Sequence, residues 1–320
     1  MLRRFLAVFE PFILALLGTV IAASLFPPRG GWVALFDFAA DAGIVLLFFL
    51  QGAKLSREAI KAGASNWRLH LAALASTFVM FPLLGLGIAA LPFLSPTIAA
   101  GMLFLTLLPS TVQSSIAFTS IARGNVAAAV CSASFSNLIG IVLTPALVAL
   151  LMHGTGTGVS FASVQTILLQ LLLPFVAGHL LRPWIGGFVA RHKALLTITD
   201  RGSILLVVYT AFGAAVVDGL WRKVPASNLA LILGLCTVLL AIVLLATWSA
   251  GRLLGFKRED RIVLLFCGSK KSLASGVPMA GVLFPAAQVG VVILPLMLFH
   301  QIQLIACALI ARRYADAVEE

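Results

Sequence analysis

The chain has 320 residues, of which 61% are hydrophobic and only 10% are charged, and its mean hydropathy is +1.10. This composition excludes an ordinary soluble domain and is typical of a helical protein that crosses a membrane several times. The formal net charge of +11 does not indicate nucleic-acid binding, because the basic residues stand in short gaps between apolar runs. We expect them to set the orientation of the chain in the lipid bilayer instead.

Apolar segments of about 20 residues, the length that crosses a bilayer, recur along the chain. The first follows Arg3 and Arg4 but is too long for a signal peptide and lacks a small-x-small cleavage site, so we expect a membrane helix. We predict an all-α polytopic membrane protein with ten transmembrane helices, at residues 5–26, 32–52, 68–92, 97–120, 125–152, 160–182, 200–219, 227–250, 261–284 and 287–311.

The basic residues predict how these spans are oriented. If the N-terminus lies inside, the inside segments hold 17 Lys and Arg residues, and the outside loops hold only Arg29, Arg222 and Lys223. This asymmetry favours two cytoplasmic termini and an even number of spans. We expect the protein in a bacterial-like inner (plasma) membrane.

Two spans have polar centres. The stretch Leu107–Phe118 (LLPSTVQSSIAF) contains Pro109 and several hydroxyl and amide groups, and Arg261–Phe284 contains Gly268–Ser272 (GSKKS). Each lysine at mid-depth costs about 2.5–3.5 kcal/mol, so such a centre is tolerated only where it faces protein or water. Interrupted spans in corresponding halves of a chain indicate the binding site of a secondary transporter.

We therefore predict an ion- or solute-binding site formed by these two spans and the span 125–152. The candidate residues are Ser110, Thr111, Gln113, Ser114, Ser115, Ser132, Ser136, Asn137, Ser269, Lys270, Lys271 and Ser272. Ser132 and Ser136 lie four residues apart, on one helical face that is expected to close the site. Capping of helix ends and hydrogen bonding between helices are the alternative roles for the hydroxyl groups. The two lysines have four candidate roles: attracting an anionic substrate, carrying a proton, replacing a bound cation as a fixed charge, or pairing with an acid.

Weak internal similarity indicates a duplication. Asp41–Leu47 resembles Asp200–Leu206, and the two interrupted spans lie in matching positions about 157 residues apart. Because a unit of five spans is odd, the second copy must be inverted relative to the first. Asp41 is the intramembrane acid of most interest. We expect the four cysteines to be small buried hydrophobic residues, since they show no paired spacing.

Several runs resemble the bile acid:sodium symporter superfamily, and within it the SBF-like branch. Pro109–Ser115 (PSTVQSS) is similar to the family's Pro-Gly-Gly-x-x-Ser-Asn motif, and Ala122–Ala127 (ARGNVA) to its Ala-Arg-Gly-Asn-Val-Ala run. Phe48–Leu55 (FFLQGAKL) resembles the end of the family's second helix, and Cys267–Pro278 (CGSKKSLASGVP) resembles the SBF-like branch. The resemblance covers essentially all ten spans.

This resemblance implies a panel domain of helices 1, 2, 6 and 7 (residues 1–62 and 154–223). It also implies a core domain of helices 3–5 and 8–10 (residues 63–153 and 224–320). Helices 4 and 9 would be unwound where they cross, and the substrate would bind between the two domains, next to the crossing.

The resemblance also implies a sodium site, from which this sequence departs. Ser114 and Ser115 stand where the symporters have a Ser-Asn pair that helps to bind sodium. The family's Glu-x-Gly-x-Gln-Asn motif falls on Cys267–Ser272, so that Cys267 replaces the sodium-binding acid and Lys271 replaces the glutamine. The loss of the acid and the gain of positive charge argue against sodium coupling of the symporter kind. Na+, with Ser114 and Ser115 as its ligands, and H+ are the candidate coupling ions.

We expect a secondary active transporter that moves a small organic anion across the bilayer by alternating access. The alternatives are a cation/proton antiporter and a non-transporting membrane regulator of ion handling. We do not expect an enzyme, because the sequence shows no nucleophile–base pair and no HExxH motif.

Overall fold

The computed structural model describes residues 11–54, 66–152, 168–219 and 225–317. Every regular element in these ranges is helical, as predicted, and seven helices are long and apolar enough to cross a membrane. In chain order the elements are α2 (Pro11–Leu25), α3 (Gly31–Lys54), α5 (Trp67–Ala75), η2 (Ser76–Met80), α6 (Phe81–Ala89), α7 (Pro96–Leu107), α8 (Gln113–Ile121), α9 (Val126–Leu151), η3 (Leu168–Leu172), α11 (Leu173–Arg191), α12 (Lys193–Val217), α14 (Ala226–Leu253), α15 (Arg258–Gly268), α16 (Leu273–Leu283) and α17 (Ala286–Asp316); η2 and η3 are π-helical turns.

Three predicted spans are shorter than a full crossing when taken as single helices. The span 5–26 is described only from residue 11 onward, as α2. The span 97–120 is divided between α7 and α8, and 261–284 is divided between α15 and α16. The divided spans are the two with polar centres. The count of ten helices and the inverted repeat remain predictions.

One predicted loop is wrong. The predicted spans 160–182 and 200–219 place residues 183–199 in a loop. In the structure α11 continues to Arg191 and α12 begins at Lys193, so only His192 separates the two helices. The length of an apolar run gives only the part of a helix that lies in lipid. The helix can continue beyond this part, because Lys and Arg are good helix formers. Pro183 is accommodated inside α11.

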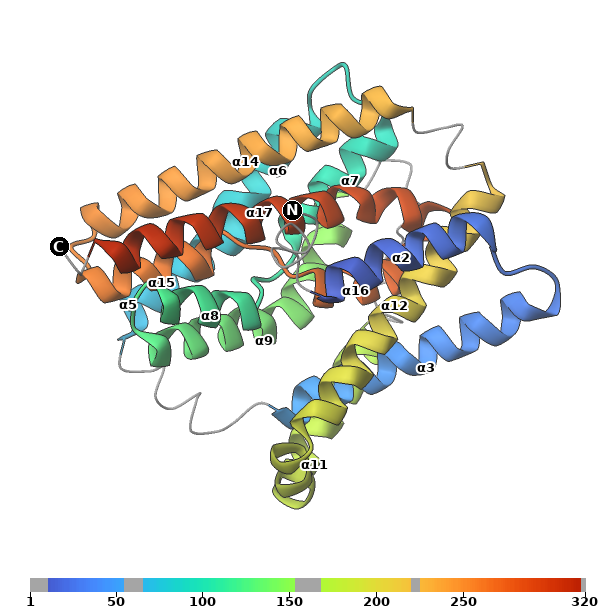
Figure 1. Ribbon diagram of the computed structural model, residues 1–320, viewed down its shortest axis with the longest axis horizontal. Coiled ribbons are helices and arrows are strands. Elements are labelled where there is room, and N and C mark those ends of the chain that lie inside the picture. The colour runs from blue at the N-terminus through green and yellow to red at the C-terminus, as the bar shows by residue number, and fades with distance from the viewer. Residues whose placement is uncertain (1–10, 55–65, 153–167, 220–224, 318–320) are drawn as a thin grey trace.

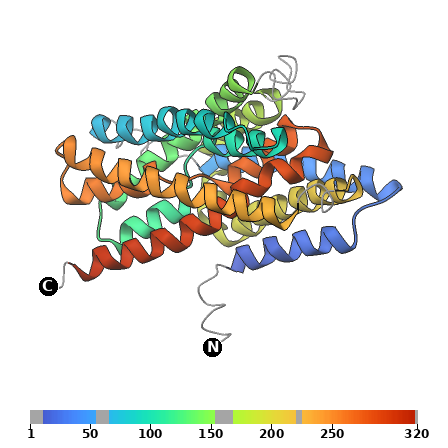
Figure 2. The same ribbon diagram turned by 90° about the horizontal axis from the view of Figure 1, so that it is seen from above.

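The helices form two groups (Figure 1). In the α3 group, α3 packs against α11 and α12, and α12 packs against α2. In the α7 group, which comprises α5 to α9 and α14 to α17, the centre is α7, buried along nearly all of Ile98–Leu107 and in contact with α6 and α17. α12 also contacts α16 and α17 and so joins the groups. Seen from above, most of the long helices run along the long axis of the molecule (Figure 2).

α3 and α11 approach each other closely at two glycines. A Cβ atom on Gly52 would lie 2.0 Å from the carbonyl oxygen of Phe175, and one on Gly178 would lie 1.9 Å from that of Phe49. There is no space for a side chain at either position, so the two backbones pack directly against each other. Small residues at helix contacts permit this approach in membranes.

We expect Gly178→Ala to lower the melting temperature of the purified protein, because the added methyl group must displace the backbone of α3. Overpacking of this kind costs about 1–3 kcal/mol. The measurement is thermal unfolding in detergent. Gly234→Ala on α14 is the matched control, since nothing lies within 4 Å of its added Cβ. Equal melting temperatures for the two variants would contradict the close approach.

Candidate functional site

Both spans that the sequence predicted to be interrupted are broken in the structure. Residues 108–112 separate α7 from α8, and we call this segment the first break. Residues 269–272 separate α15 from α16 and form the second break. Each break exposes carbonyl groups at the end of one helix and N–H groups at the start of the next, and these need partners inside the protein.

Hydrogen bonds join the two breaks directly. The amide nitrogen of Ser272 donates to the carbonyl oxygen of Pro109 at 2.9 Å. Ser110 Oγ donates to the carbonyl oxygen of Cys267 at 2.6 Å, and Ser115 Oγ donates to the preceding carbonyl, that of Phe266, at 3.1 Å. Both serines are completely buried. Their hydroxyl protons therefore serve the C-terminal end of α15.

α9 supports the first break. Ser136 Oγ accepts a hydrogen bond from the amide nitrogen of Ser110, and Asn137 Nδ2 donates to the carbonyl oxygen of the same residue, each at 2.9 Å. Asn137 Oδ1 also accepts a hydrogen bond from Ser275 Oγ at 2.9 Å, just after the second break. A single amide side chain, which both donates and accepts, thus connects the surroundings of the two breaks.

Lys271 is completely buried, and its ammonium group lies among backbone oxygens. Nζ donates to the carbonyl oxygens of Thr77, Thr106 and Leu108 at 2.8, 2.8 and 2.7 Å. The side-chain amide of Gln303 holds the backbone N–H and C=O of Lys271, at 2.9 Å each. This lysine therefore connects the second break to the π-helical turn η2, to the end of α7 and to α17.

Lys270 is also completely buried but has different neighbours. Its Nζ donates to Ser114 Oγ at 3.4 Å and lies 4.5 Å from the centroid of the Phe118 ring, where the face of the ring attracts a cation. Within the part of the chain that the structure describes, neither buried lysine pairs with an acid.

The run Ala122–Ala127, one of those that resemble the symporter family, forms the turn between α8 and α9. Arg123 adopts a left-handed conformation with φ of 56°, and Asn125 caps α9 by accepting a hydrogen bond from Ala128 N at 3.1 Å. Asn125 Nδ2 also donates to Asp260 Oδ1 at 2.9 Å. This turn fixes α8 and α9 to the start of α15.

The remaining candidates divide into two sets. Ser132 forms a hydrogen bond of 2.6 Å with His70 Nδ1 on α5, and Ser269 Oγ donates back into its own helix, so these hydrogen bonds do not join either residue to another candidate. The set that shares a cavity consists of Thr111, Gln113, Ser114, Asn137 and Ser272.

This cavity has a volume of about 320 Å³ and adjoins both breaks. Its lining comes from the α7 group and also from α3, α11 and α12. Neither Lys270 nor Lys271 is part of the lining. The polar lining residues that the sequence analysis did not propose are Gln51, Lys54, Ser134, Thr197, Asp200, Arg201, Ser275 and His300.

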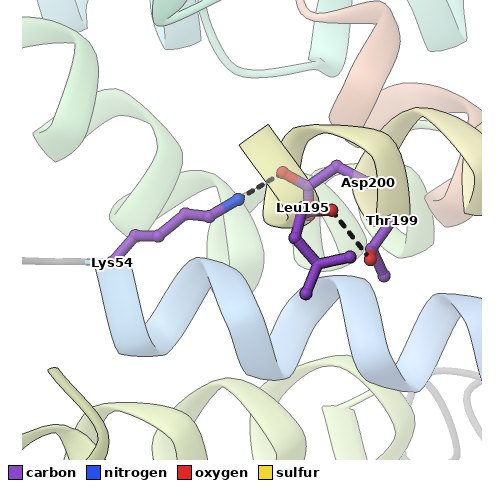
Figure 3. Close-up of polar contacts among 4 residues, drawn as sticks. All are labelled: Lys54, Leu195, Thr199 and Asp200. Carbon is purple, nitrogen blue, oxygen red and sulfur yellow. Dashed lines mark hydrogen bonds and ion pairs between the residues drawn. The ribbon is translucent and has the colours of Figure 1, made fainter. Parts of the chain in front are cut away.

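An ion pair joins α3 to α12 at this cavity (Figure 3). Lys54 Nζ, at the end of α3, donates to Asp200 Oδ2. The other carboxylate oxygen, Oδ1, is buried and has no hydrogen-bond partner among the described residues. With Arg201, the part of the lining that the structure describes contains two cationic side chains and one carboxylate. Asp41, the acid that the sequence favoured, is exposed and does not line the cavity.

Residues 10–316 match the SBF-like CPA transporter family. The chain belongs to this family. It is 56% identical over 309 residues to "Uncharacterized protein PA2026" of Pseudomonas aeruginosa (96% of this chain, 93% of that protein) and 54% identical over 315 residues to "Putative symporter YfeH" of Escherichia coli (98% and 95%). It is also 25% identical over 305 residues to "Sodium/bile acid cotransporter 7" of Rattus norvegicus (92% and 89%). These matches confirm the resemblance seen in the motifs.

This member of the SBF-like family is thus a multi-pass membrane protein of a transporter family. Sequence reasoning missed Lys54 and Arg201, because basic residues near the ends of spans ordinarily report orientation only. It also missed Gln303, whose sole signal is a polar side chain within an apolar span.

We expect Asn137→Leu to lower the melting temperature, because it leaves the buried carbonyl of Ser110 without its donor and removes the acceptor of the Ser275 hydroxyl proton. An unsatisfied buried polar group costs about 1–3 kcal/mol. The same exchange at Asn228, in the first turn of α14, is the control and should leave thermal unfolding nearly unchanged. If Asn137→Leu melts like the wild type, the amide does not hold the breaks.

Proposed function

We propose that the protein is a secondary active transporter that moves a small organic anion across the inner membrane by alternating access. In this proposal ten helices form two inverted repeats, with the α3 group as the panel domain and the α7 group as the core domain. The observation that carries the proposal is the cavity, which both groups line and which both breaks adjoin. Broken helices at a site between two helix groups are typical of secondary transporters.

The charge of the lining supports an anionic solute. Among the described residues of the lining, Lys54 and Arg201 outnumber the single carboxylate of Asp200. Arg binds carboxylate, sulfonate or phosphate groups through paired N–H donors. Apolar side chains, among them Leu138 and Phe175, also line the cavity, beside its hydroxyl and amide groups. The solute that suits this lining has one anionic group and an apolar body, and its size is small because the cavity is at the lower end of the usual range for ligand sites.

The position of the basic residues supports a cavity on the cytoplasmic side. Lys54 is the last residue of α3, and Arg201 lies in the first half of α12. Both belong to the ends that the distribution of Lys and Arg assigns to the cytoplasm, together with both termini. In this proposal we assign the structure to the inward-facing stage of the transport cycle.

We expect Arg201→Gln to weaken the apparent affinity for the transported anion about ten- to hundredfold. A hydrogen bond to a charged group contributes about 1.5–3 kcal/mol, and 1.4 kcal/mol corresponds to a factor of ten. The measurement is uptake of a panel of radiolabelled organic anions by proteoliposomes. Arg313→Gln, at the exposed end of α17, is the control. An equal effect of both variants, or no effect of either, would contradict a role for Arg201 in the site.

A cation/proton antiporter is the second candidate, and one observation favours it. Asp200 lines the cavity, is paired with Lys54 and keeps one buried oxygen without a partner, which suits a carboxylate that exchanges protons. An imposed sodium or potassium gradient across proteoliposomes that contain a pH-sensitive dye separates the candidates. An anion transporter leaves the internal pH unchanged, whereas an antiporter shifts it, and Asp200→Asn abolishes the shift. If neither flux occurs, the third interpretation, a non-transporting regulator, is the one that survives.

A further inference from the structure

The contacts of Lys271 suit the protonated form of its side chain. Its Nζ lies 2.7–2.8 Å from three carbonyl oxygens, those of Thr77, Thr106 and Leu108. Carbonyl oxygens only accept hydrogen bonds, so three short contacts require three N–H donors. An ammonium group has three, whereas a neutral amine has two. The Phe81 ring, whose centroid lies 4.1 Å from Nζ, adds a further contact that attracts a cation.

The position of this ammonium is one that a metal cation would otherwise suit. Thr106 and Leu108 supply carbonyls from the end of α7, and Thr77 supplies one from the π-helical turn η2. Carbonyls freed at the C-terminal end of a broken helix carry the negative end of the helix dipole, and in secondary transporters they coordinate Na+. Here the chain's own side chain carries the single positive charge at that position.

The residues around the breaks fit a sodium ion less well than they fit the ammonium group of Lys271. None of the hydrogen bonds described for the two breaks involves a carboxylate. At the pair that the family resemblance assigned to sodium, Ser115 Oγ donates to Phe266 O, and Ser114 Oγ lies 3.4 Å from the Nζ of Lys270. A sodium ion there would meet a buried ammonium and, among the described contacts, no carboxylate.

We infer that Lys271 is a built-in cation that takes the place of a coupling sodium ion at the breaks. The two breaks are therefore held together by a covalently attached charge through the whole transport cycle, and their stability is independent of sodium. This inference rests on the proposed function for its meaning in transport. Uptake of the anion then proceeds without a sodium gradient.

The test is thermal unfolding of the detergent-purified full chain in sodium, methylammonium and choline chlorides at equal ionic strength. We expect the wild type to melt within about 1 °C in all three salts, because a ligand raises the melting temperature only if it binds the folded state. We expect Lys271→Ala to melt several degrees lower in choline and to recover at least half of that loss in sodium or methylammonium, since either cation fits the vacated carbonyl shell. Lys257→Ala, an exposed lysine at the start of α15, should show neither effect.

Two results would overturn the inference. One is a saturable rise of the wild-type melting temperature with sodium, which needs no variant and shows that the native protein binds the ion. The other is a loss in Lys271→Ala that is identical in all three salts; if that variant does not fold, Lys271→Gln is compared in the same way. Because no flux is measured, a failure of anion uptake alone would reject the proposed function and leave this result standing.

Discussion

Backbone groups that a broken helix leaves unpaired within a membrane must find partners inside the protein, and this constraint shapes the centre of the molecule. Thr144 Oγ1 donates to the last carbonyl of α7 at 2.8 Å, and Lys271 donates to the carbonyls on either side of it. Ser76 Oγ donates to the last carbonyl of α15 at 2.7 Å, and Ser110 donates to the one before. Polar side chains at mid-depth are thus required to keep two helices broken, before any solute is considered.

This constraint separates the polar residues of the centre into two kinds. Ser110, Ser115 and Ser136 are buried and bonded to backbone groups, as is Lys271, so their first effect is on stability. Thr111, Gln113 and Ser114 line the cavity, where a solute has access to them under the proposed function. Ser272 also lines it, but this residue is buried and its Oγ accepts a hydrogen bond from the amide nitrogen of Ser275. Asn137 belongs to both kinds, because it holds the first break and also lines the cavity.

The two breaks could be predicted from the sequence, but the contacts around them could not. Pro109 in one span, and Lys270 and Lys271 in the other, are each incompatible with a lipid-facing helix. Each interruption could therefore be predicted from the sequence of its own span. The pairing of Lys54 with Asp200 joins residues 146 positions apart. When a helix is apolar on all sides, its sequence does not show which face packs against which neighbour. For example, α7 is buried almost all round and α11 is mostly exposed, although both sequences are apolar. For the same reason the repeat predicted a role for Asp41, while the cavity contains its counterpart Asp200.

The burial of the two lysines changes where a solute's charge is recognised under the proposed function. The ammonium of Lys271 has no N–H left for a solute, and Lys270 is not part of the cavity lining. The cationic contacts therefore pass to Lys54 and Arg201 on α3 and α12. Those helices belong to the α3 group, whereas the hydroxyl and amide groups beside the breaks belong to the α7 group. A solute that contacts both groups stabilises one arrangement of them over another, and such a difference in affinity is what a ligand needs in order to shift a conformational equilibrium. In the proposed function, the α3 group supplies the cationic contacts and the α7 group supplies the hydroxyl and amide contacts. Binding of the solute is therefore linked to the relative movement of the two groups.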